Sequence, residues 1–565
     1  MAVGIAIAFV SRHKLFGVWP VLTAFLRKYR QVQADPVLRR WLIGRAIGRW
    51  PGEPAYQAHR PPYAADHLPL TAEEPRWDGA SLDVPAPDKA MIMPLPGSSL
   101  TVAPGDLSGL FDKSFVDTEA LLGLHRFAWL PWLGDQADPV WVDALWRAWC
   151  DSAGTVDDSW AWHPYTAAER AINILRFAHA QGLPGDRDRT LGILAAHAPA
   201  IAQRLEYFGD HHTGNHLCNN GRGLFLLGLG LGLPQATELG ALILLREAER
   251  ILMPSGVLRE GSSHYHLLLT RNLRECATAA RAHRRPEADD LDRIVARMLA
   301  VLPHLNLPGG LPLIGDISPD AEPALFADLL QSDQDPVDGE LLRQDGWLRA
   351  DFGPWSGLWH AAPEGWSHMP GHGHQDLGSF ELHHEGNRVF VDPGRGAYGE
   401  EGEAALYRSA RAHNGLLVDG ADPYAANKPY YNADFRQRLG GEPPTLQCQG
   451  NGIFLRHDGF GRLKAGGSVT RSWIFEDNRL TLRDEIGGMG VHKTNRLFHT
   501  ALPVERDDKD VIIGGYFRLS TDQGFILRSA TIWEAYGRGR PGTCIDIDQT
   551  VTLPTSLIVR LEVLD

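Results

Sequence analysis

The feature that most constrains the fold of this chain is a change of hydrophobic period near its middle. Between about residues 110 and 305, apolar residues recur three and four positions apart, as in "YTAAERAINILRFAHAQ" and "LDRIVARMLAVL". After about residue 345, polar and apolar residues alternate, as in "SLIVRLEVLD" at the end of the chain. The first spacing is that of an amphipathic helix, and alternation is that of a β-strand. The sequence therefore predicts a helical half followed by a β half.

The two halves have different expected architectures. Pro or Gly separates the helical segments, which favours an array of helix pairs, closed or open. In the second half, "GSFELHHEGNRVFVD" predicts two strands joined at Glu385–Asn387, and Gly-rich turns without intervening helices indicate antiparallel sheets. We therefore divide the chain into residues 1–105, 106–340 and 341–565, with the joint between the halves at 309–351.

The first 105 residues differ from the rest. Residues 1–50 hold nine Lys or Arg and one acidic residue, and 15–50 are predicted to be helical. Such a segment fits a helix pair packed on the main body, or an arm that contacts a membrane surface or a partner. Residues 51–105 are rich in Pro, Gly and Ala, which predicts a long irregular connection.

Composition excludes several classes of protein. The net charge of −14 argues against general nucleic-acid binding. No stretch of 18 apolar residues occurs, so no spanning helix is expected. The five cysteines are an odd number without a CxxC motif, and they do not form a disulfide framework. Without a clear secretory signal, a cytoplasmic location is favoured, with the periplasm second. The oligomeric state is left open.

Two polar clusters lie in the helical half. "GDHHTGNHLCNNGRG" places Asn215, His216 and Asn219 just before an apolar run, and "LREGSSHYHLLLTRN" places Glu260 and Tyr265 at the start of a helix. Both clusters fit helix caps, because Asn and Ser side chains commonly cap helices. So many hydrogen-bonding side chains together also fit a binding or catalytic site.

A third cluster lies in the β half. "GHGHQDLGSF" carries His372 and His374, and the segments that follow carry Asp392 and His413. Two imidazoles and a carboxylate are the donors of a zinc site, so His374, Asp392 and His413 are candidate ligands. Three ligands with one open position are also typical of a hydrolytic zinc, so this spacing leaves a metallohydrolase open.

Several stretches together resemble the heparinase II/III-like polysaccharide lyases. They are "GNHLCNNGRGL", "REGSSHYH", "GHGHQDLGSFELHHEGNRVFVDPG" and "RSARAHNGLLVDG", supported by "WHPYTAAERAINIL", "LPLIGDIS" and "RSWIFEDNRLTLRDEIGG". The resemblance covers about residues 120–560. It implies an N-terminal (α/α) toroid followed by a C-terminal antiparallel β-sandwich, with the substrate between them. It also implies β-elimination on an anionic, uronic-acid-containing polysaccharide or oligosaccharide.

That chemistry needs three kinds of group, which the resemblance assigns. Asn215 and His216 would neutralise the uronate carboxylate. Tyr265 would be the acid, and in some geometries the base as well, and His372 would be the partner base or a second neutralising group. Candidate substrate-binding residues are Arg395, Glu260, Asn219 and Tyr398.

The resemblance makes the zinc structural: His374, Asp392 and His413 would hold it and fix the loop that carries His372. Two other functions stay open. One is a zinc-dependent glycan hydrolase, and the other is a non-catalytic glycan-binding or exopolysaccharide-assembly protein on the same fold.

Overall fold

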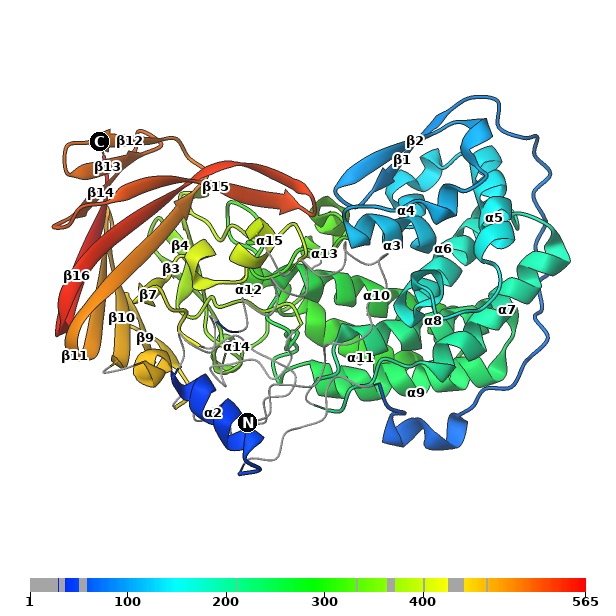
Figure 1. The fold of residues 1–565 in the computed structure, drawn as a ribbon, viewed down its shortest axis with the longest axis horizontal. Coiled ribbons are helices and arrows are strands. Elements are labelled where there is room, and N and C mark those ends of the chain that lie inside the picture. The colour runs from blue at the N-terminus through cyan, green and yellow to red at the C-terminus, as the bar shows by residue number, and fades with distance from the viewer. Residues whose placement is uncertain are drawn as a thin grey trace, which may run out of the picture.

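The structure is a computed structural model that describes residues 29, 36–49, 58–210, 212–331, 334–362, 371–399, 402–424, 442–463 and 466–564. It has a helical body and a β body side by side (Figure 1). The basic N-terminal segment is described only at Tyr29 and over 36–49, where α2 (Pro36–Ala46) confirms part of the predicted helix. The rest of that prediction lies outside the described residues.

The helical body follows the predicted 3.6-residue period. Its longer helices are α5 (Pro139–Ala153), α6 (Pro164–Gln181), α7 (Arg187–Gln203), α8 (Asn215–Leu231), α9 (Pro234–Ile251), α10 (Ser263–Ala282) and α11 (Ala288–Leu299). Shorter ones are α3 (Thr118–Arg126), α4 (Trp129–Leu133), α12 (Leu302–Leu305), α13 (Ala327–Leu330) and α14 (Gly339–Gln344). Pro begins α5, α6 and α9, where its missing N–H costs no helical hydrogen bond. Helix α8 packs against α6, α7, α9 and α10.

The β body contains two antiparallel sheets. A four-stranded sheet has the order β3 (Trp347–Phe352), β4 (Trp355–His360), β5 (Ser379–His384), β6 (Asn387–Phe390). A ten-stranded sheet is built around β10 (Gly466–Glu476), β11 (Arg479–Thr500) and β16 (Arg538–Val563). Its other strands are β7 (Leu416–Val418), β8 (Thr445–Gln449), β9 (Gly452–His457), β12 (Val504–Asp507), β13 (Asp510–Ile513), β14 (Phe517–Thr521) and β15 (Ile526–Ala535).

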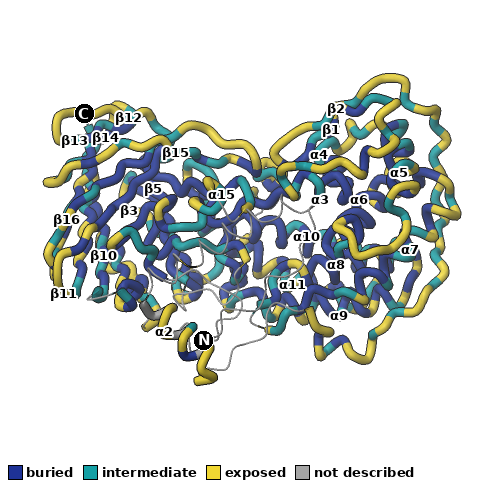
Figure 2. The backbone as a smooth tube through the Cα atoms, viewed as in Figure 1, coloured by how far each residue is buried: buried dark blue, intermediate teal, exposed yellow. Residues whose placement is uncertain are grey.

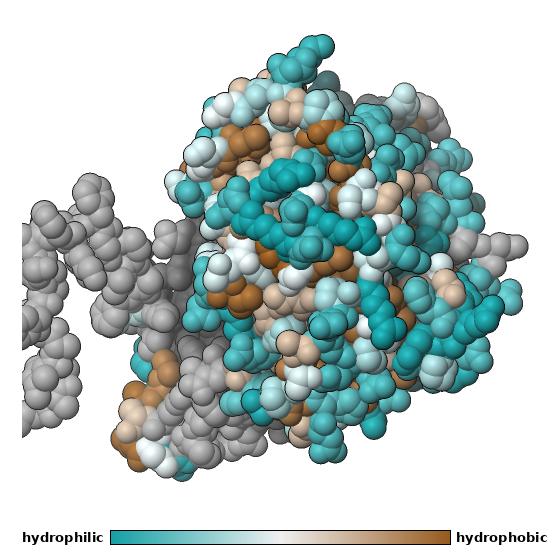
Figure 3. All heavy atoms as spheres, turned by 90° about the vertical axis from the view of Figure 1, so that its right-hand side faces the viewer, coloured by the Kyte–Doolittle hydropathy of each residue, from teal (hydrophilic) through white to brown (hydrophobic). Residues whose placement is uncertain are grey.

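The two sheets share one aromatic core. Trp359 of β4 lies edge-on to Trp473 of β10, with ring centroids 6.0 Å apart, and both side chains are fully buried. Buried segments continue from this core into the helical body (Figure 2). The prediction of helices first and antiparallel sheets second is confirmed. At the helical end of the molecule, hydrophilic and hydrophobic residues are interspersed on the surface (Figure 3).

One expectation about the N-terminal region needs correction. The connection predicted to be irregular contains a hairpin of β1 (Met91–Leu95) and β2 (Ser98–Val102). Two five-residue strands give only a short stretch of alternating polar and apolar residues. The turn at Pro96-Gly97 has the composition of the Pro- and Gly-rich residues around it, so the sequence does not distinguish it from an irregular connection. Among the described residues, no helix combines the length and apolar character needed to cross a membrane.

The β1–β2 hairpin contacts the β body through its turn. Gly97 lies against Gly537 in the turn between β15 and β16, and a Cβ atom on Gly537 would lie 2.0 Å from the Cα atom of Gly97. Tyr536 donates a hydrogen bond to Asp117 beside this contact, and Arg538 pairs with Glu322. Figure 1 shows the β15–β16 hairpin reaching toward β1 and β2. Two hairpins from opposite ends of the chain therefore join the bodies.

We expect Gly537→Ala to lower the free energy of unfolding by roughly 1–3 kcal/mol, because the added methyl group displaces the opposing turn. Gly515→Ala is the matched control. Gly515 has a similar positive φ, +76° against +69°, but nothing lies within 4 Å of its Cβ position. Urea unfolding of the three proteins separates backbone strain from the contact. Equal losses for the two variants would contradict a close contact between the turns.

Candidate active site

Tyr265 and His372 meet where the two bodies join. Tyr265 lies in the first turn of α10, whose N-cap Ser262 accepts a hydrogen bond from the Tyr265 backbone N–H. His372 lies in the loop before β5. The two rings stack with centroids 3.4 Å apart and planes 11° from parallel. The structure thus brings a phenol from the helical body and an imidazole from the β body into contact.

The Tyr265 phenol is held as a neutral hydroxyl. Its oxygen lies 2.7 Å from the hydroxyl of Tyr398, which donates to the Ile317 carbonyl at 3.0 Å. A carbonyl oxygen only accepts hydrogen bonds, so the Tyr398 hydroxyl hydrogen is used in that bond. The Tyr265 hydroxyl therefore donates a hydrogen bond to the Tyr398 oxygen. Burial, and next the nearby Asp320 carboxylate, raise the pKa of Tyr265 well above its ordinary value. This environment suits a proton donor.

Asp316 fixes the loop that carries His372. Its carboxylate accepts from His372 Nδ1 at 3.2 Å, His374 Nε2 at 2.8 Å and Arg395 Nη1 at 3.0 Å. Its backbone N–H also donates to the His372 carbonyl. Burial opposes the charge of Asp316, but the two histidines and Arg395 outweigh burial and hold its pKa well below the ordinary value. One carboxylate from the joint between the bodies therefore orients three side chains of the β body.

Glu260 contacts the other side of the predicted site. Its Oε2 lies 3.3 Å from His372 Nε2, and its Oε1 accepts from the backbone N–H of Asn215 at 2.6 Å. Glu260 is fully buried. This carboxylate links the first turn of α8 to the His372 loop.

His216 lies in an adjacent polar group. Its Nδ1 is 2.7 Å from Oε1 of Glu206, and its ring is 4.7 Å from that of Tyr165. The Tyr165 hydroxyl donates to Asp320, which also pairs with Arg126. The His216 side chain is 47% exposed, in contrast to the nearly buried His372.

Glu206 changes the charge state of His216. Partial loss of solvent lowers the pKa of His216, but the Glu206 carboxylate and their hydrogen bond raise it by more, so the net shift is upward. Burial of Glu206 raises its own pKa, but His216, His163 and Asn220 lower it to about 2. The pair therefore favours an imidazolium next to a carboxylate.

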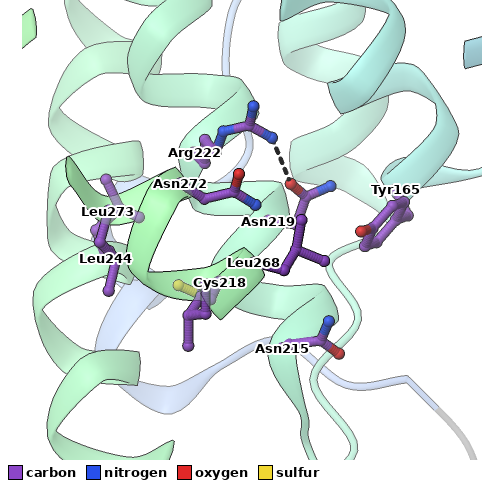
Figure 4. A pocket seen from close by; sticks show the side chains of 10 residues that line it. Tyr165, Asn215, Cys218, Asn219, Arg222, Leu244, Leu268, Asn272 and Leu273 are labelled. Carbon is purple, nitrogen blue, oxygen red and sulfur yellow. Dashed lines mark hydrogen bonds between the residues drawn. The ribbon is translucent and has the colours of Figure 1, made fainter. Parts of the chain in front are cut away.

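The other predicted substrate contacts are less accessible. Arg395 donates to Asp316, to the Ala404 carbonyl and to the Gly399 carbonyl, so its guanidinium serves the protein interior. Asn215 and Asn219 line a cavity of about 10 Å³, with room for about one water molecule. Figure 4 shows Asn219 next to Arg222, which donates to its Oδ1, and Asn215 farther down the same helix.

The three candidate metal ligands lie close together, but the structure does not leave a free ligand atom on each of them. Asp392 Oδ2 accepts from His413 Nδ1 at 2.8 Å, so Asp392 stands behind His413. In the part of the chain that the structure describes, no group of three or more His, Cys, Asp or Glu side chains is arranged to hold a metal ion. His374 Nδ1 and His413 Nε2, however, are buried without a hydrogen-bond partner among the described residues. A carboxylate holds the opposite nitrogen of each ring, which is the usual arrangement around zinc-binding histidines, so these residues fit a metal.

Sequence reasoning missed several members of this site. They are Asp316, Asp320, Tyr165, Arg126 and Glu206. Asp316 lies in "LPLIGDIS" and Tyr165 in "WHPYTAAERAINIL", two stretches that resemble the family but do not by themselves assign a role to these side chains. That signal marked the segments, while the contacts that give them a role join residues far apart in sequence.

Comparisons with known proteins identify the second half of the chain. Residues 335–554 match the family model described as heparinase II/III-like, C-terminal. The crystal structure of a heparinase III aligns with a TM-score of 0.60 and 17% identity over 80% of this chain and 79% of the other. The heparinase III BT4657 gene product aligns with a TM-score of 0.52 and 16% identity over 80% of both chains. A heparan sulfate lyase HepC mutant from Pedobacter heparinus aligns with a TM-score of 0.50 and 16% identity, over 80% and 78%.

The family match over residues 335–554 confirms the resemblance seen in the motifs of the β half. The structural matches extend over both bodies, which shows that the helical half shares the fold as well. No curated protein matches the sequence in a direct search.

We expect Glu206→Gln to lower the pKa of His216, because the charge that favours the imidazolium is removed. In the wild type, the pKa of His216 is higher in the folded state than in the unfolded state. Protonated His216 therefore stabilises the fold, and this contribution is complete below the unfolded-state pKa. This contribution is lost as the pH rises through the folded value. Titration of the imidazole protons by NMR measures both proteins. Glu249→Gln, an exposed carboxylate on α9, is the control, and an unchanged His216 in Glu206→Gln would contradict the assignment.

Proposed function

We propose that this protein is a polysaccharide lyase that cleaves uronic-acid-containing glycans by β-elimination. The observation that carries the proposal is the stacked pair of Tyr265 and His372, contributed by different bodies. The proposed architecture is an (α/α) toroid followed by an antiparallel β-sandwich. Acid and base must lie next to the same sugar unit for this reaction, and the pair meets that requirement.

The proposed reaction moves one proton from carbon to the base and one from the acid to the leaving oxygen. His372 Nε2 takes the proton from C5 of the uronate, the C4–O4 bond breaks as the C4–C5 double bond forms, and Tyr265 protonates O4. Asp316 holds His372 Nδ1, which leaves the lone pair on Nε2. The imidazolium that results lies between Asp316 and Glu260, and these carboxylates stabilise it.

The uronate carboxylate has to be neutralised before C5 loses a proton. His216 is suited to this because Glu206 favours its charged form and nearly half of its side chain is exposed. Asn215, one residue before it, is buried beside the cavity of about 10 Å³, so His216 is the accessible member of the predicted pair. Tyr398 would keep the Tyr265 proton in place until the leaving oxygen approaches.

We expect Tyr265→Phe to lower kcat roughly 10²- to 10⁴-fold with KM almost unchanged, because only the proton is lost. Ultraviolet absorbance of the conjugated double bond, measured with a panel of polyuronates, follows the reaction. The matched control is Tyr424→Phe, a buried tyrosine of the β body whose hydroxyl has no hydrogen-bond partner among the described residues.

The same assay separates the alternatives. A zinc hydrolase would cleave glycans without new absorbance, and a glycan-binding protein would bind without cleavage. Tyr265→Phe with wild-type turnover would show that the acid is another group.

A structural zinc is part of the proposal. His374 and His413 would hold it through the two unpartnered nitrogens, and Asp392, predicted as the third ligand, would instead orient His413 through its hydrogen bond to Nδ1. When bound, the ion would cross-link the loop before β5 to the segment before β7.

We expect His413→Ala to lose bound zinc and to unfold at a lower temperature than the wild type. Metal content by mass spectrometry and thermal unfolding measure the two effects, with exposed His283→Ala as the control. Full zinc content in His413→Ala, or none in the wild type, would contradict the site.

A further inference from the structure

Two arginines lie in the interior of the β body. The side chains of Arg471 in β10 and Arg496 in β11 are 2% and 0% exposed. Arg471 Nη1 donates to the carbonyls of Gly378 and Asn414. All three guanidinium nitrogens of Arg496, by contrast, are buried without a hydrogen-bond partner among the described residues. Buried charged groups in folded proteins are paired and hydrogen-bonded, so this guanidinium requires a partner.

Strand pairing places both arginines in one layer of the core. Arg496 is paired with Leu416 of β7, and Leu416 packs in one hydrophobic cluster with Val469 of β10. Arg471 lies two residues after Val469, and alternate residues of a strand point to the same side of a sheet. Arg471 and Arg496 therefore point into the same part of the interior. Burial lowers the pKa of Arg496 to about 10, Asp484 opposes this change, and the nearby charge of Arg471 adds to it.

One buried carboxylate faces the two arginines. Asp484 is paired with Arg471 across β10 and β11, and its Oδ1 lies 3.0 Å from Arg471 Nε. These atoms lack the alignment of a hydrogen bond, and both Asp484 oxygens are buried without such a bond in the part of the chain that the structure describes. Asp522, which also acts on Arg496, is exposed. Two buried guanidinium groups thus share one buried carboxylate, which leaves one net positive charge in this layer.

Two neutral side chains add donors to the same layer. Gln549 of β16 is paired with Thr494, which lies two residues before Arg496 on the same face of β11. The amide nitrogen and oxygen of Gln549 are buried, and neither has a hydrogen-bond partner that the structure describes. The same is true of the indole N–H of Trp473, two residues after Arg471 in β10. Unpartnered donors therefore outnumber unpartnered acceptors here, which is the composition of an anion site.

We propose that this layer binds one small monovalent anion of the chloride type between Arg471, Arg496 and Gln549. A single negative charge balances the single excess positive charge. Water would satisfy the donors but leave the charge unbalanced, and a dianion would reverse its sign. The proposal goes beyond the lyase function and does not depend on it.

The position of the anion gives it a structural role. Arg471 holds the carbonyls of Gly378 and Asn414, and Asn414 directly follows His413 of the proposed zinc site. Gly378 lies in the loop before β5, which also carries the other zinc-binding histidine that we propose. A bound anion that fixes Arg471 therefore stabilises the two segments that the zinc would cross-link.

The first test is thermal unfolding of the full chain in sodium chloride, compared with sodium gluconate of equal ionic strength, whose anion is too large to enter the core. We expect chloride to raise the Tm of the wild type saturably, by roughly 5 °C at about 100 times its dissociation constant. Arg496→Met removes the excess charge and keeps an unbranched side chain, so this variant should lose the response. Arg483→Gln is the matched control, because Arg483 is an exposed neighbour of Asp484 in the same strand and should keep the response.

A second measurement does not depend on the folding of a variant. Long-wavelength diffraction from wild-type crystals grown in sodium chloride should give an anomalous peak between Arg471 and Arg496 at least as strong as that of the Cys544 sulfur. Density at this position without an anomalous signal would show that water alone fills the layer, and would overturn the proposal. An equal chloride response of the wild type and Arg496→Met would overturn it as well.

Discussion

The site depends on one carboxylate, that of Asp316. It comes from the segment between the two bodies, and it accepts hydrogen bonds from His372, His374 and Arg395 of the β body. A buried carboxylate without such partners would be costly, so the three side chains and Asp316 hold one another in place. Tyr265 reaches His372 because Ser263, two residues before it, donates to the carbonyl of Ile314 in the same segment. The joint thus orients both members of the proposed catalytic pair.

Charge around the site is arranged in matched pairs. Glu206 faces His216, Asp320 faces Arg126, and Glu275 faces Arg222. Arg126 and Arg222 are buried, whereas the His216 side chain is 47% exposed, so the anionic polymer that we propose as substrate would meet His216 rather than the two arginines. Net charge alone therefore says little about the substrate.

The sequence predicted the order of the bodies because helix and strand periods differ over long segments, as in α6 and β16. It also placed Tyr265 and His372 on the right kinds of element, through motifs that resemble a known family. It did not reveal Asp316 or Asp320, because their role comes from hydrogen bonds to residues 50 or more positions away. The prediction that Arg395 binds substrate rests on its position shortly after Asp392 in the sequence. Sequence spacing does not determine the direction in which a guanidinium points. The hairpin of β1 and β2 was missed because two five-residue strands give a weak signal inside a region rich in Pro and Gly.

The position of β16 has a consequence for synthesis. This last strand lies inside the ten-stranded sheet, paired with β11, β14 and β15, and its first residues form the turn that touches Gly97. On a ribosome the helical body can fold before β16 is made, but the sheet lacks a central strand until β16 emerges. Contacts between such distant positions form slowly. The proposed site is therefore complete only once β16 has paired, because this strand both fills the sheet and begins at the turn that touches Gly97.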